Sequence, residues 1–510
     1  MSFQETIQSA YTFKGESAYL GIGMLDGQAV ENASVHLPLK TMNRHGLIAG
    51  ATGTGKTKTL QVLAECLSDA SIPVMLMDIK GDLSGIGAAG TANDKINERC
   101  QIMNIAFKAS AYPIEFLTLS DEPGTRLRAT VSEFGPVLFS KILGLNETQE
   151  GIISMLFKYC DDKQLPLLDL KDIIKVLQYI SNEGKDELKE TYGTISTQST
   201  GTILQKIIEL QQQKADIFFG EKSFEVEDLM RISDDGRGLL SIVRVTDLQD
   251  RPKLFSTFML QLLAELYASM PEAGDLEKPT LVLFIDEAHL IFQDASKALL
   301  QQLETVIKLI RSKGVGIFFI TQNPTDIPQS ILGQLGLKVQ HALRAFTAKD
   351  RQDIKKIAQN YPETEYYKTE DLITQLGIGE AFVTLLNEKG IPTPLVHTLL
   401  RPPYSRMDIL QENEIQSIIA QSKIASKYNV VIDSKSAYEL LNEKLASANE
   451  EEEPKTTTSS KKEKGTLETI LDNPVTKQVG RTAASIITRS LLGVLGLGGT
   501  TRKRKTKSWF

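Results

Sequence analysis

The sequence predicts an α/β fold, with a mostly parallel, doubly wound sheet that is interrupted by a helical insertion. Two observations carry this prediction. Short apolar runs typical of buried strands alternate with stretches of helical periodicity from about residue 46 to residue 405. Between residues 136 and 232 the helical periodicity continues without strands. We therefore expect the core to comprise 41–135 and 233–405, with the insertion at 136–232 between its two parts.

The composition sets the class of protein. The chain has 510 residues, of which 41% are hydrophobic and 24% charged, enough for two or more globular domains. A net charge of -7 and a pI of 5.6 give no global sign of nucleic-acid binding. The three cysteines, Cys66, Cys100 and Cys160, lack metal-binding or redox spacing, so we expect them to be reduced and buried. No signal-peptide core and no apolar run of roughly 18 residues occurs, which predicts a cytoplasmic protein.

The N-terminal segment, 1–40, contains short alternating stretches around 19–23 and 33–39. Alternation of apolar and polar residues is typical of half-buried strands. These stretches predict a few β-strands and are too few for a separate barrel domain.

Residues 50–57, Gly-Ala-Thr-Gly-Thr-Gly-Lys-Thr, match the phosphate-binding pattern G-x-x-x-x-G-K-[ST]. The glycines let several backbone N–H groups point at one anion, Lys56 can reach the β- and γ-phosphates, and Thr57 offers its hydroxyl to Mg²⁺. A buried strand at 46–49 leads into the loop and an amphipathic helix at 59–67 leads out, which places a phosphate at a helix N-terminus. The alternative, a glycine-rich turn, does not need Lys56 followed by Thr57. The predicted nucleotide-binding residues are Gly50, Ala51, Thr52, Gly53, Thr54, Gly55, Lys56, Thr57 and Lys58.

A second motif is the apolar run 281–285, which ends in Asp286 and Glu287. Such a run is typical of a strand buried on both faces, as in parallel sheets. Because ligands of open α/β sheets lie beyond the carboxyl ends of the strands, we expect Asp286 beside Mg²⁺, acting through its water shell. Glu287 would then polarise the attacking water as a general base. The alternative is an acidic pair that caps the next helix, at 289–292.

Further strands and helices complete the predicted core. A strand at 74–78 is followed by a polar segment at 80–84, which we expect to face the site as well. The other predicted strands are 238–245, 316–321 ending at Gln322, 338–343, 381–386 and 395–399, with helices at 252–270 and 295–311. In the insertion, apolar stripes that we interpret as core packing are Ile152, Ile153, Leu156 and Phe157; Leu168, Ile173, Ile174, Leu177 and Ile180; and Ile203, Leu204, Ile207, Ile208 and Leu210.

The C-terminal part divides by composition. A helical region is expected at 406–449 and a disordered linker at 450–464, followed by a tail at 465–510. In the tail, an apolar stretch at 486–497 precedes a basic cluster at 502–507, which could contact phosphates or an anionic membrane. The alternative is a solvated basic end on a flexible tether.

These segments together resemble the HerA/FtsK branch of P-loop motor ATPases over roughly residues 40–405. The likeness is strongest to a bacterial HerA-like family defined largely by sequence. Its characteristic strings resemble LFIDEAHL at 283–290, LIRSKGVG at 309–316 and TQNP at 321–324, and further similar segments are 198–210, 218–221 and 340–346.

The resemblance implies a RecA-like core, ATP hydrolysis and a homo-oligomeric ring, usually a hexamer. It assigns Lys56 and Thr57 to ATP and Mg²⁺, Asp286 to the metal and Glu287 to the attacking water. These roles agree with those expected from the two motifs themselves.

Two more residues take roles from the resemblance. Gln322 is similar to a γ-phosphate sensor, and the alternative is a strand-end amide that holds the following turn. Arg311 matches the position of an arginine finger in HerA-type motors, and the alternative is a cation at a helix C-terminus, stabilised by the macrodipole.

In one respect the sequence departs from the family. HerA motors that process DNA ends carry a substantial N-terminal β-barrel for docking a nuclease, whereas only about 40 residues precede the core here. This argues against a nuclease partner. The sequence thus predicts an ATP-hydrolysing ring motor with DNA as the candidate substrate. The rival predictions are a protein-remodelling ATPase, using the helical insertion as its partner surface, and a nucleotide-gated scaffold without turnover.

Overall fold

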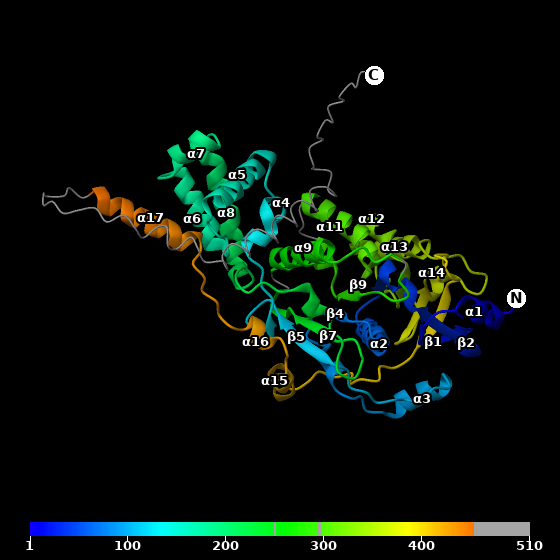
Figure 1. The fold of residues 1–510 in the computed structure, drawn as a ribbon. Helices are drawn as coiled ribbons and strands as arrows, with labels where there is room; N and C mark the ends of the chain where they lie inside the picture. Colours follow the sequence, from blue (N-terminus) through cyan, green and yellow to red (C-terminus); the bar gives the residue numbers. More distant parts are fainter. Residues whose placement is uncertain (249–250, 275, 293–296, 453–510) are drawn as a thin grey trace, which may run out of the picture. The chain divides into compact units, whose positions relative to one another are not determined.

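The computed structural model describes residues 1–248, 251–274, 276–292 and 297–452. The chain forms two compact units, one of Met1–Ala129 with Glu209–Asp433 and the other of Thr130–Ile208 with the chain from Ser434 onward (Figure 1). The second unit contains most of the predicted helical insertion, whose limits of 136 and 232 stay predictions.

The first unit is built on a 12-stranded sheet with the order β2-β1-β12-β11-β10-β3-β9-β8-β4-β7-β5-β6. Pairing is parallel from β10 through to β6, which confirms the predicted mostly parallel α/β sheet. These strands are β3 (Gly46–Ala49), β4 (Val74–Asp78), β5 (Ile114–Thr118), β6 (Thr125–Arg126), β7 (Leu240–Arg244), β8 (Leu281–Ile285), β9 (Val315–Thr321) and β10 (Leu337–Gln340).

Burial explains which strands the sequence predicts. Every residue of β3, β4, β8 and β9 is buried, as their unbroken apolar runs require. β5 was not predicted, because its five residues include Glu115, whose carboxylate pairs with Arg231 at 2.8 Å. β10 ends at Gln340, three residues before its predicted end.

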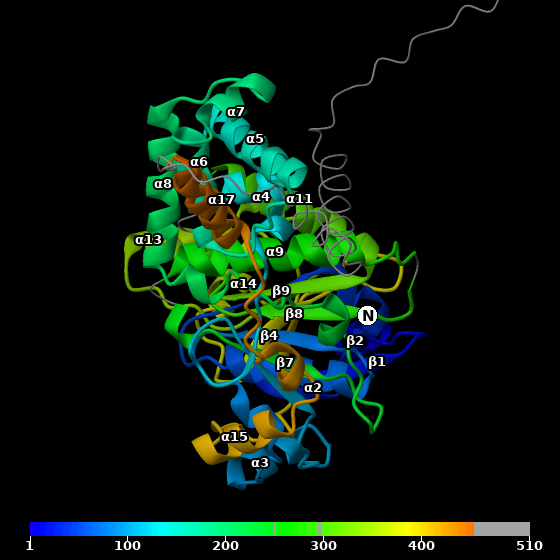
Figure 2. The same ribbon diagram turned by 60° about the vertical axis from the view of Figure 1, so that its left-hand side comes forward.

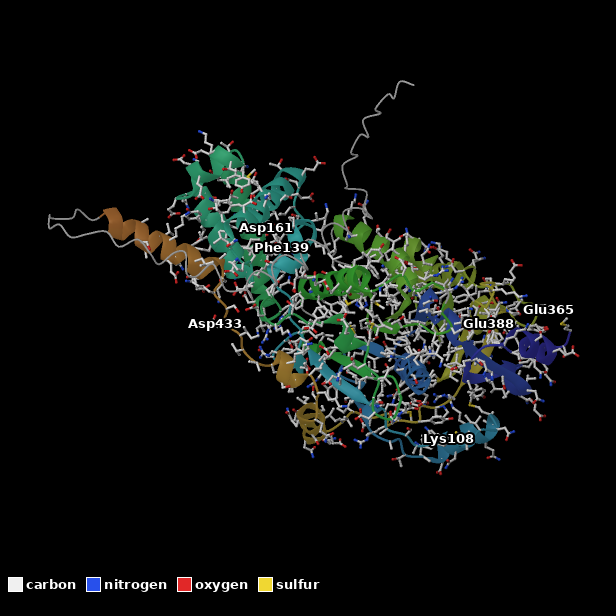
Figure 3. The ribbon with its side chains drawn as sticks, in the orientation of Figure 1. Lys108, Phe139, Asp161, Glu365, Glu388 and Asp433 are labelled. Carbon is white, nitrogen blue, oxygen red and sulfur yellow. The ribbon has the colours of Figure 1, made fainter. Side chains whose placement is uncertain are left out.

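The other side of the sheet is antiparallel. It consists of β11 (Glu380–Thr384), β12 (Val396–Leu400), β1 (Ser17–Leu25) and β2 (Gln28–Pro38), so the N-terminal strands extend the sheet of the core. Helix α1 (Phe3–Ala10) packs against β2. The Tyr11 hydroxyl donates to the carbonyls of Val383 and Pro394, and Glu388 accepts from the backbone N–H groups of Lys14 and Gly15 (Figure 3).

Crossover helices cover both faces of the sheet. Helix α2 (Lys56–Asp69) connects β3 to β4, whereas α9 (Pro252–Ser269), α11 (Lys297–Ile310) and α12 (Gln329–Leu332) connect strands that advance along the sheet in the opposite direction. Because parallel crossovers are right-handed, α2 lies on one face and the other three on the opposite face. Figure 2 shows α2 on one side of the sheet and α9 and α11 on the other. The predicted helix 295–311 is too long at its C-terminal end: α11 stops at Ile310, and Arg311 begins a 3₁₀ turn that Gly314 closes in the left-handed region, with φ 76°.

The remaining helices of the first unit are short. They are α3 (Asp94–Ile102), α10 (His289–Phe292), α13 (Ala348–Ala358), α14 (Thr369–Leu372), α15 (Glu412–Ala420) and α16 (Ala425–Tyr428). Among the described helices of both units, none combines the length and the apolar character that crossing a membrane requires.

The second unit is helical where it is described. Its helices are α4 (Val131–Leu143), α5 (Glu147–Lys163), α6 (Leu170–Ser181), α7 (Lys185–Thr191), the larger part of α8 (Thr197–Gln212) and α17 (Ala437–Glu452). Phe139, labelled in Figure 3, packs against Phe157 with ring centroids 6.3 Å apart. The buried Asp172 of α6 accepts from the Ser436 hydroxyl, which docks α17. One stripe residue was misassigned to the core: Ile208 is 48% exposed.

The C-terminal predictions lie mostly outside the described residues. Helix α17 continues to Glu452, so the first residues of the predicted linker are helical, and 453–464 and the tail 465–510, with its apolar stretch and basic cluster, fall beyond the description. Cys66, Cys100 and Cys160 are all free and buried, as expected.

A buried ion pair holds the segment after β12 on helix α2. Arg401 donates to Glu65 at 2.9 Å, and the two residues are 5% and 0% exposed. Glu65 also accepts from the backbone N–H groups of Tyr404 and Ser405, at 3.1 and 2.9 Å. Segment 401–405 is therefore fixed to the middle of the helix that follows the phosphate loop.

We predict that Arg401→Leu lowers the free energy of unfolding by about 3–5 kcal/mol, because it leaves the Glu65 carboxylate buried without its cation. Urea denaturation followed by circular dichroism measures the change. Lys423→Leu is the control, since the Lys423–Asp234 pair is largely exposed and should contribute little. A loss for Arg401→Leu no larger than that of the control would contradict the prediction.

Candidate active site

The phosphate loop connects β3 to α2 at the carboxyl edge of the sheet. The Gly50 N–H donates to the Thr321 carbonyl at 3.3 Å, and the Ala51 N–H donates to the Ala342 carbonyl at 2.8 Å, so the neighbouring strands on both sides hold the loop. Gly50 has φ 153°, and a Cβ there would lie 2.5 Å from the Cβ of His341. Only glycine fits this turn.

The lysine of the loop is buried, and its side chain folds back onto the backbone of the loop. The Lys56 ammonium donates to the Ala51 carbonyl at 3.1 Å, and the residue is 7% exposed. Burial lowers the pKa of Lys56, and the nearby Lys80 lowers it further. Thr57 follows at the first turn of α2 and is half-buried, and the Lys58 ammonium donates to the carbonyl of Met407. The Lys56 ammonium and the Thr57 hydroxyl thus lie where the loop passes into helix α2.

The acidic pair follows β8 directly, and both side chains are buried, with Asp286 4% and Glu287 6% exposed. Lys80, two residues after β4, ion-pairs with Glu287 and lies 3.8 Å from Asp286 Oδ2. His289 Nδ1 is 3.2 Å from the second oxygen of Glu287. One cation therefore serves both carboxylates of the pair.

The two carboxyl groups differ in acidity. Burial raises the pKa of Asp286 to about 6, although Lys80 opposes the shift. Burial also acts on Glu287, but its close pairing with Lys80 outweighs it and holds the pKa of Glu287 below its ordinary value. Near neutral pH Glu287 is an anion, as a base that accepts a proton must be.

The backbone of Glu287 is strained. Its φ is 44°, in the left-handed region that non-glycine residues rarely adopt, and its N–H donates to Asp286 Oδ1 at 2.9 Å. Such strain costs of order 1–3 kcal/mol and is found at functional sites. This acidic turn is held in one conformation by its surroundings.

The end of β9 meets the phosphate loop. The Thr52 hydroxyl donates to Gln322 Oε1 at 3.3 Å, and the Gln322 side chain is near enough to Glu287 to help lower the pKa of its carboxyl group. Within the described residues, the turn after β9 is held by Asp326, which accepts from the Thr321 hydroxyl at 2.6 Å and the Asn323 N–H at 3.3 Å. Gln322 thus bonds the loop and lies near the acidic pair.

Arg311 is not part of this cluster. It is exposed and precedes β9, whereas Gln322 follows the same strand. Seven residues of strand separate them, roughly 20 Å at about 3.3 Å per residue. Among the described residues the guanidinium of Arg311 has no hydrogen-bonding or ion-pair partner. Within one chain, the structure therefore brings together Lys56, Thr57, Asp286, Glu287 and Gln322, and leaves Arg311 at the other edge of the sheet.

The residues present suit a magnesium ion bound together with phosphates. No group of three or more His, Cys, Asp or Glu side chains in the described part of the chain could hold a metal alone. Magnesium typically keeps several waters and takes one or two carboxylates plus substrate phosphates. Thr57 and Asp286 supply that donor set at the mouth of the loop.

Comparison with known proteins identifies the family. The sequence model of the family described as helicase HerA-like C-terminal matches residues 24–469. The chain belongs to this family. It is 24% identical to the DNA double-strand break repair helicase HerA of Saccharolobus solfataricus over 386 residues, or 74% of this chain and 68% of the relative. With the same helicase of Sulfurisphaera tokodaii it is 25% identical over 349 residues, covering 67% of this chain and 62% of the relative.

Solved structures show the same fold. The unbound bacterial conjugative coupling protein TrwB matches with a TM-score of 0.51 and 14% identity, over 80% of this chain and 94% of TrwB. TrwB bound to a non-hydrolysable ATP analogue matches with a TM-score of 0.52 and 14% identity, over 78% and 98%. The HerA-like chain thus has a RecA-type P-loop core and is an ATP-hydrolysing enzyme.

Sequence reasoning missed the buried pair behind the loop. His341, which follows β10, is fully buried, and its Nε2 lies 2.9 Å from the hydroxyl of Thr59 in α2. A histidine next to a strand end carries no motif, so only the structure shows that it supports the loop. Lys80 was noted only as part of a polar segment, because its pairing with the acids depends on β4 lying beside β8.

We predict that His341 makes the protein acid-sensitive. Burial lowers its pKa to about 4, and the charge of Lys56 adds to this, whereas the unfolded chain protonates near 6.5. The stability from this group is present above pH 6.5 and is lost as the pH falls toward 4. At about 1.36 kcal/mol per pH unit, the wild type should lose up to roughly 3 kcal/mol more than His341→Gln over that range. Urea unfolding at several pH values measures this, and parallel curves for the two proteins would exclude it.

Proposed function

We propose that this protein forms a ring of six subunits, hydrolyses ATP with Mg²⁺ and moves DNA in the cytoplasm. One observation carries the proposal: the five residues of the nucleotide site converge at one edge of the sheet, while Arg311 is exposed at the other. A further support is the helicase activity named for the archaeal relatives, whose length this chain matches over about two thirds.

Within a subunit, the residues divide the work. Lys56 and the loop N–H groups bind the β- and γ-phosphates, and Thr57 and Asp286 hold Mg²⁺. The metal supplies charge neutralisation for the phosphates. Glu287 accepts the proton of the attacking water, and Gln322, which accepts from Thr52 and lies near Glu287, positions groups around the γ-phosphate.

Lys80 sets the charge of the site before nucleotide arrives. Its ammonium balances the acidic pair while no phosphate is present. Lys80 contacts Oε1 of Glu287 and leaves Oε2 without a hydrogen-bond donor among the described residues, so Oε2 is the oxygen that would accept the proton of the attacking water.

Arg311 would complete the site of a neighbouring subunit. It is too far from its own phosphate loop, and its exposed guanidinium is free among the described residues to cross an interface. An arginine that stabilises transition-state charge is worth about 10³–10⁵ in turnover. Lysine would replace it poorly, because it lacks the planar fork.

DNA as the substrate is tested by stimulation of hydrolysis. We expect duplex or single-stranded DNA to raise ATP turnover, with the effect falling as salt rises, because phosphate contacts release counterions. Stimulation by RNA or by a protein partner alone would instead favour another substrate, with the separate helical unit as the partner surface. Tight nucleotide binding without turnover would favour a scaffold.

We predict that Lys56→Ala loses nucleotide binding, because a positive charge on the phosphates disappears. Glu287→Gln should bind ATP as the wild type does but hydrolyse it at least a hundredfold more slowly, within the range of about 10²–10⁴ for general-base catalysis. Calorimetric titration and phosphate release measure the two properties. Equal turnover by Glu287→Gln and wild type would remove the general-base assignment.

A second prediction concerns the shared site. Arg311→Ala and Lys56→Ala chains should each be inactive alone, but when mixed they form some interfaces with an intact loop opposite an intact Arg311, so part of the activity should return. The control is a mixture of Glu287→Gln with Lys56→Ala, in which every loop-intact subunit lacks its own base. Wild-type turnover by Arg311→Ala alone would rule out the arginine's role directly.

A further inference from the structure

A pocket lies beside helix α2 and has no role in the proposed chemistry. Its volume is about 260 Å³, and it lies between α3, the loops on either side of α3 and segment 403–408. Ile96, Phe107 and Met407 give it apolar walls, and Gly90 contributes backbone. Lys108, labelled in Figure 3, is the chain neighbour of Phe107. All of these residues belong to the first unit.

One wall of the pocket is bonded to the helix that begins in the phosphate loop. The Lys58 ammonium, one residue after Thr57, donates to the carbonyl of Met407. One turn further along α2, the Gln61 amide donates to the Ser405 hydroxyl at 2.6 Å and to the Arg406 carbonyl at 2.9 Å. Segment 405–407 thus lies against the first two turns of α2.

A second wall is tied to the loop from another side. The Gly379 N–H donates to the Thr54 carbonyl at 3.1 Å, and Arg99 of α3 donates to the Gly379 carbonyl at 3.3 Å and the Ile378 carbonyl at 2.9 Å. Ile96 is on the same helix, one turn before Arg99. Both sides of the pocket are therefore held at fixed positions relative to the phosphate loop.

Among the described residues that line the pocket, the Thr91 hydroxyl and one oxygen of Asp408 are left for a ligand. The guanidinium of Arg406 is engaged by Glu414 at 2.9 and 3.0 Å, and Ser405 is bound to α2. Asp408 accepts the Ile409 N–H through Oδ1 at 2.9 Å, and its Oδ2 accepts no hydrogen bond from the described residues. A ligand here needs a flat apolar body and a donor group.

We propose that this pocket binds the adenosine part of the nucleotide whose phosphates lie on residues 50–57, which deepens the proposed function and rests on it. The volume is just below the roughly 300 Å³ of small ligand pockets, so it accepts a base with part of its sugar and leaves the phosphates outside. The base packs against Phe107 and Met407. Asp408 accepts a hydrogen bond from the exocyclic amine of adenine or from a ribose hydroxyl.

The test is calorimetric titration of the full chain with the β,γ-imido analogue of ATP and with inorganic tripolyphosphate, both with Mg²⁺. Met407→Ala should weaken binding of the ATP analogue roughly fivefold to tenfold, because an apolar contact is lost, and leave the affinity for tripolyphosphate unchanged. The carbonyl that accepts from Lys58 remains in this variant. Ile409→Ala is the matched control, since Ile409 is a similarly exposed neighbour (47% against 36%) that does not line the pocket.

Asp408→Asn separates the two hydrogen-bond sources. A smaller preference for the ATP analogue over the GTP analogue assigns Asp408 to the adenine amine, because guanine presents a carbonyl at that position. A smaller preference for the ATP analogue over its 2′-deoxy form assigns Asp408 to the ribose hydroxyl. If neither affinity ratio changes, the role of Asp408 is overturned.

Other outcomes decide the proposal as a whole. Unchanged affinity of Met407→Ala for the ATP analogue, or an equal loss for the analogue and tripolyphosphate, overturns the adenosine pocket. Wild-type protein that binds neither probe would instead refute the phosphate site, so the two failures are distinguishable.

Discussion

The parallel pairing of β3, β9 and β8 is the constraint on which the site depends. Their register sets Ala49 opposite Thr321, and Ile285 opposite Phe319, so the three strands end at nearly the same level. The phosphate loop, Gln322 and the acidic pair are therefore neighbours although they are far apart in sequence. A slip in one pairing would separate groups that contact each other across less than 4 Å. The crossover from β3 covers one face and that from β9 the other, which opens a crevice between these strands, where open α/β sheets bind ligands.

Much of this site was predictable, because buried parallel strands and a phosphate loop leave strong local patterns. The strand that ends before Asp286 and the loop that contains Lys56 were both placed correctly from their residues. The apolar stripes of the insertion were predicted less well: a helical period locates a face but not its limits, and Ile208 lies outside the core. The assigned roles of the site residues remain predictions until variants are measured.

The rest depends on contacts between segments distant in sequence. Strand β5 carries a buried glutamate whose partner, Arg231, is more than a hundred residues away. Lys80 reaches the acidic pair only because β4 lies beside β8, and His341 supports the phosphate loop only because β10 lies beside β3. The same holds for Arg401, whose buried pairing with Glu65 fixes the chain after β12 on α2. Local sequence patterns contain none of these pairings.

The position of Arg311, at the opposite end of β9 from Gln322, has a consequence for how catalytic capacity scales with assembly. If each arginine serves the next subunit, a complete site belongs to an interface and not to a chain. An isolated subunit then has none, an open row of subunits always has one site fewer than it has members, and only closure gives every subunit a working site. The closed ring is in that case the smallest assembly in which every phosphate loop faces an arginine of a neighbouring subunit.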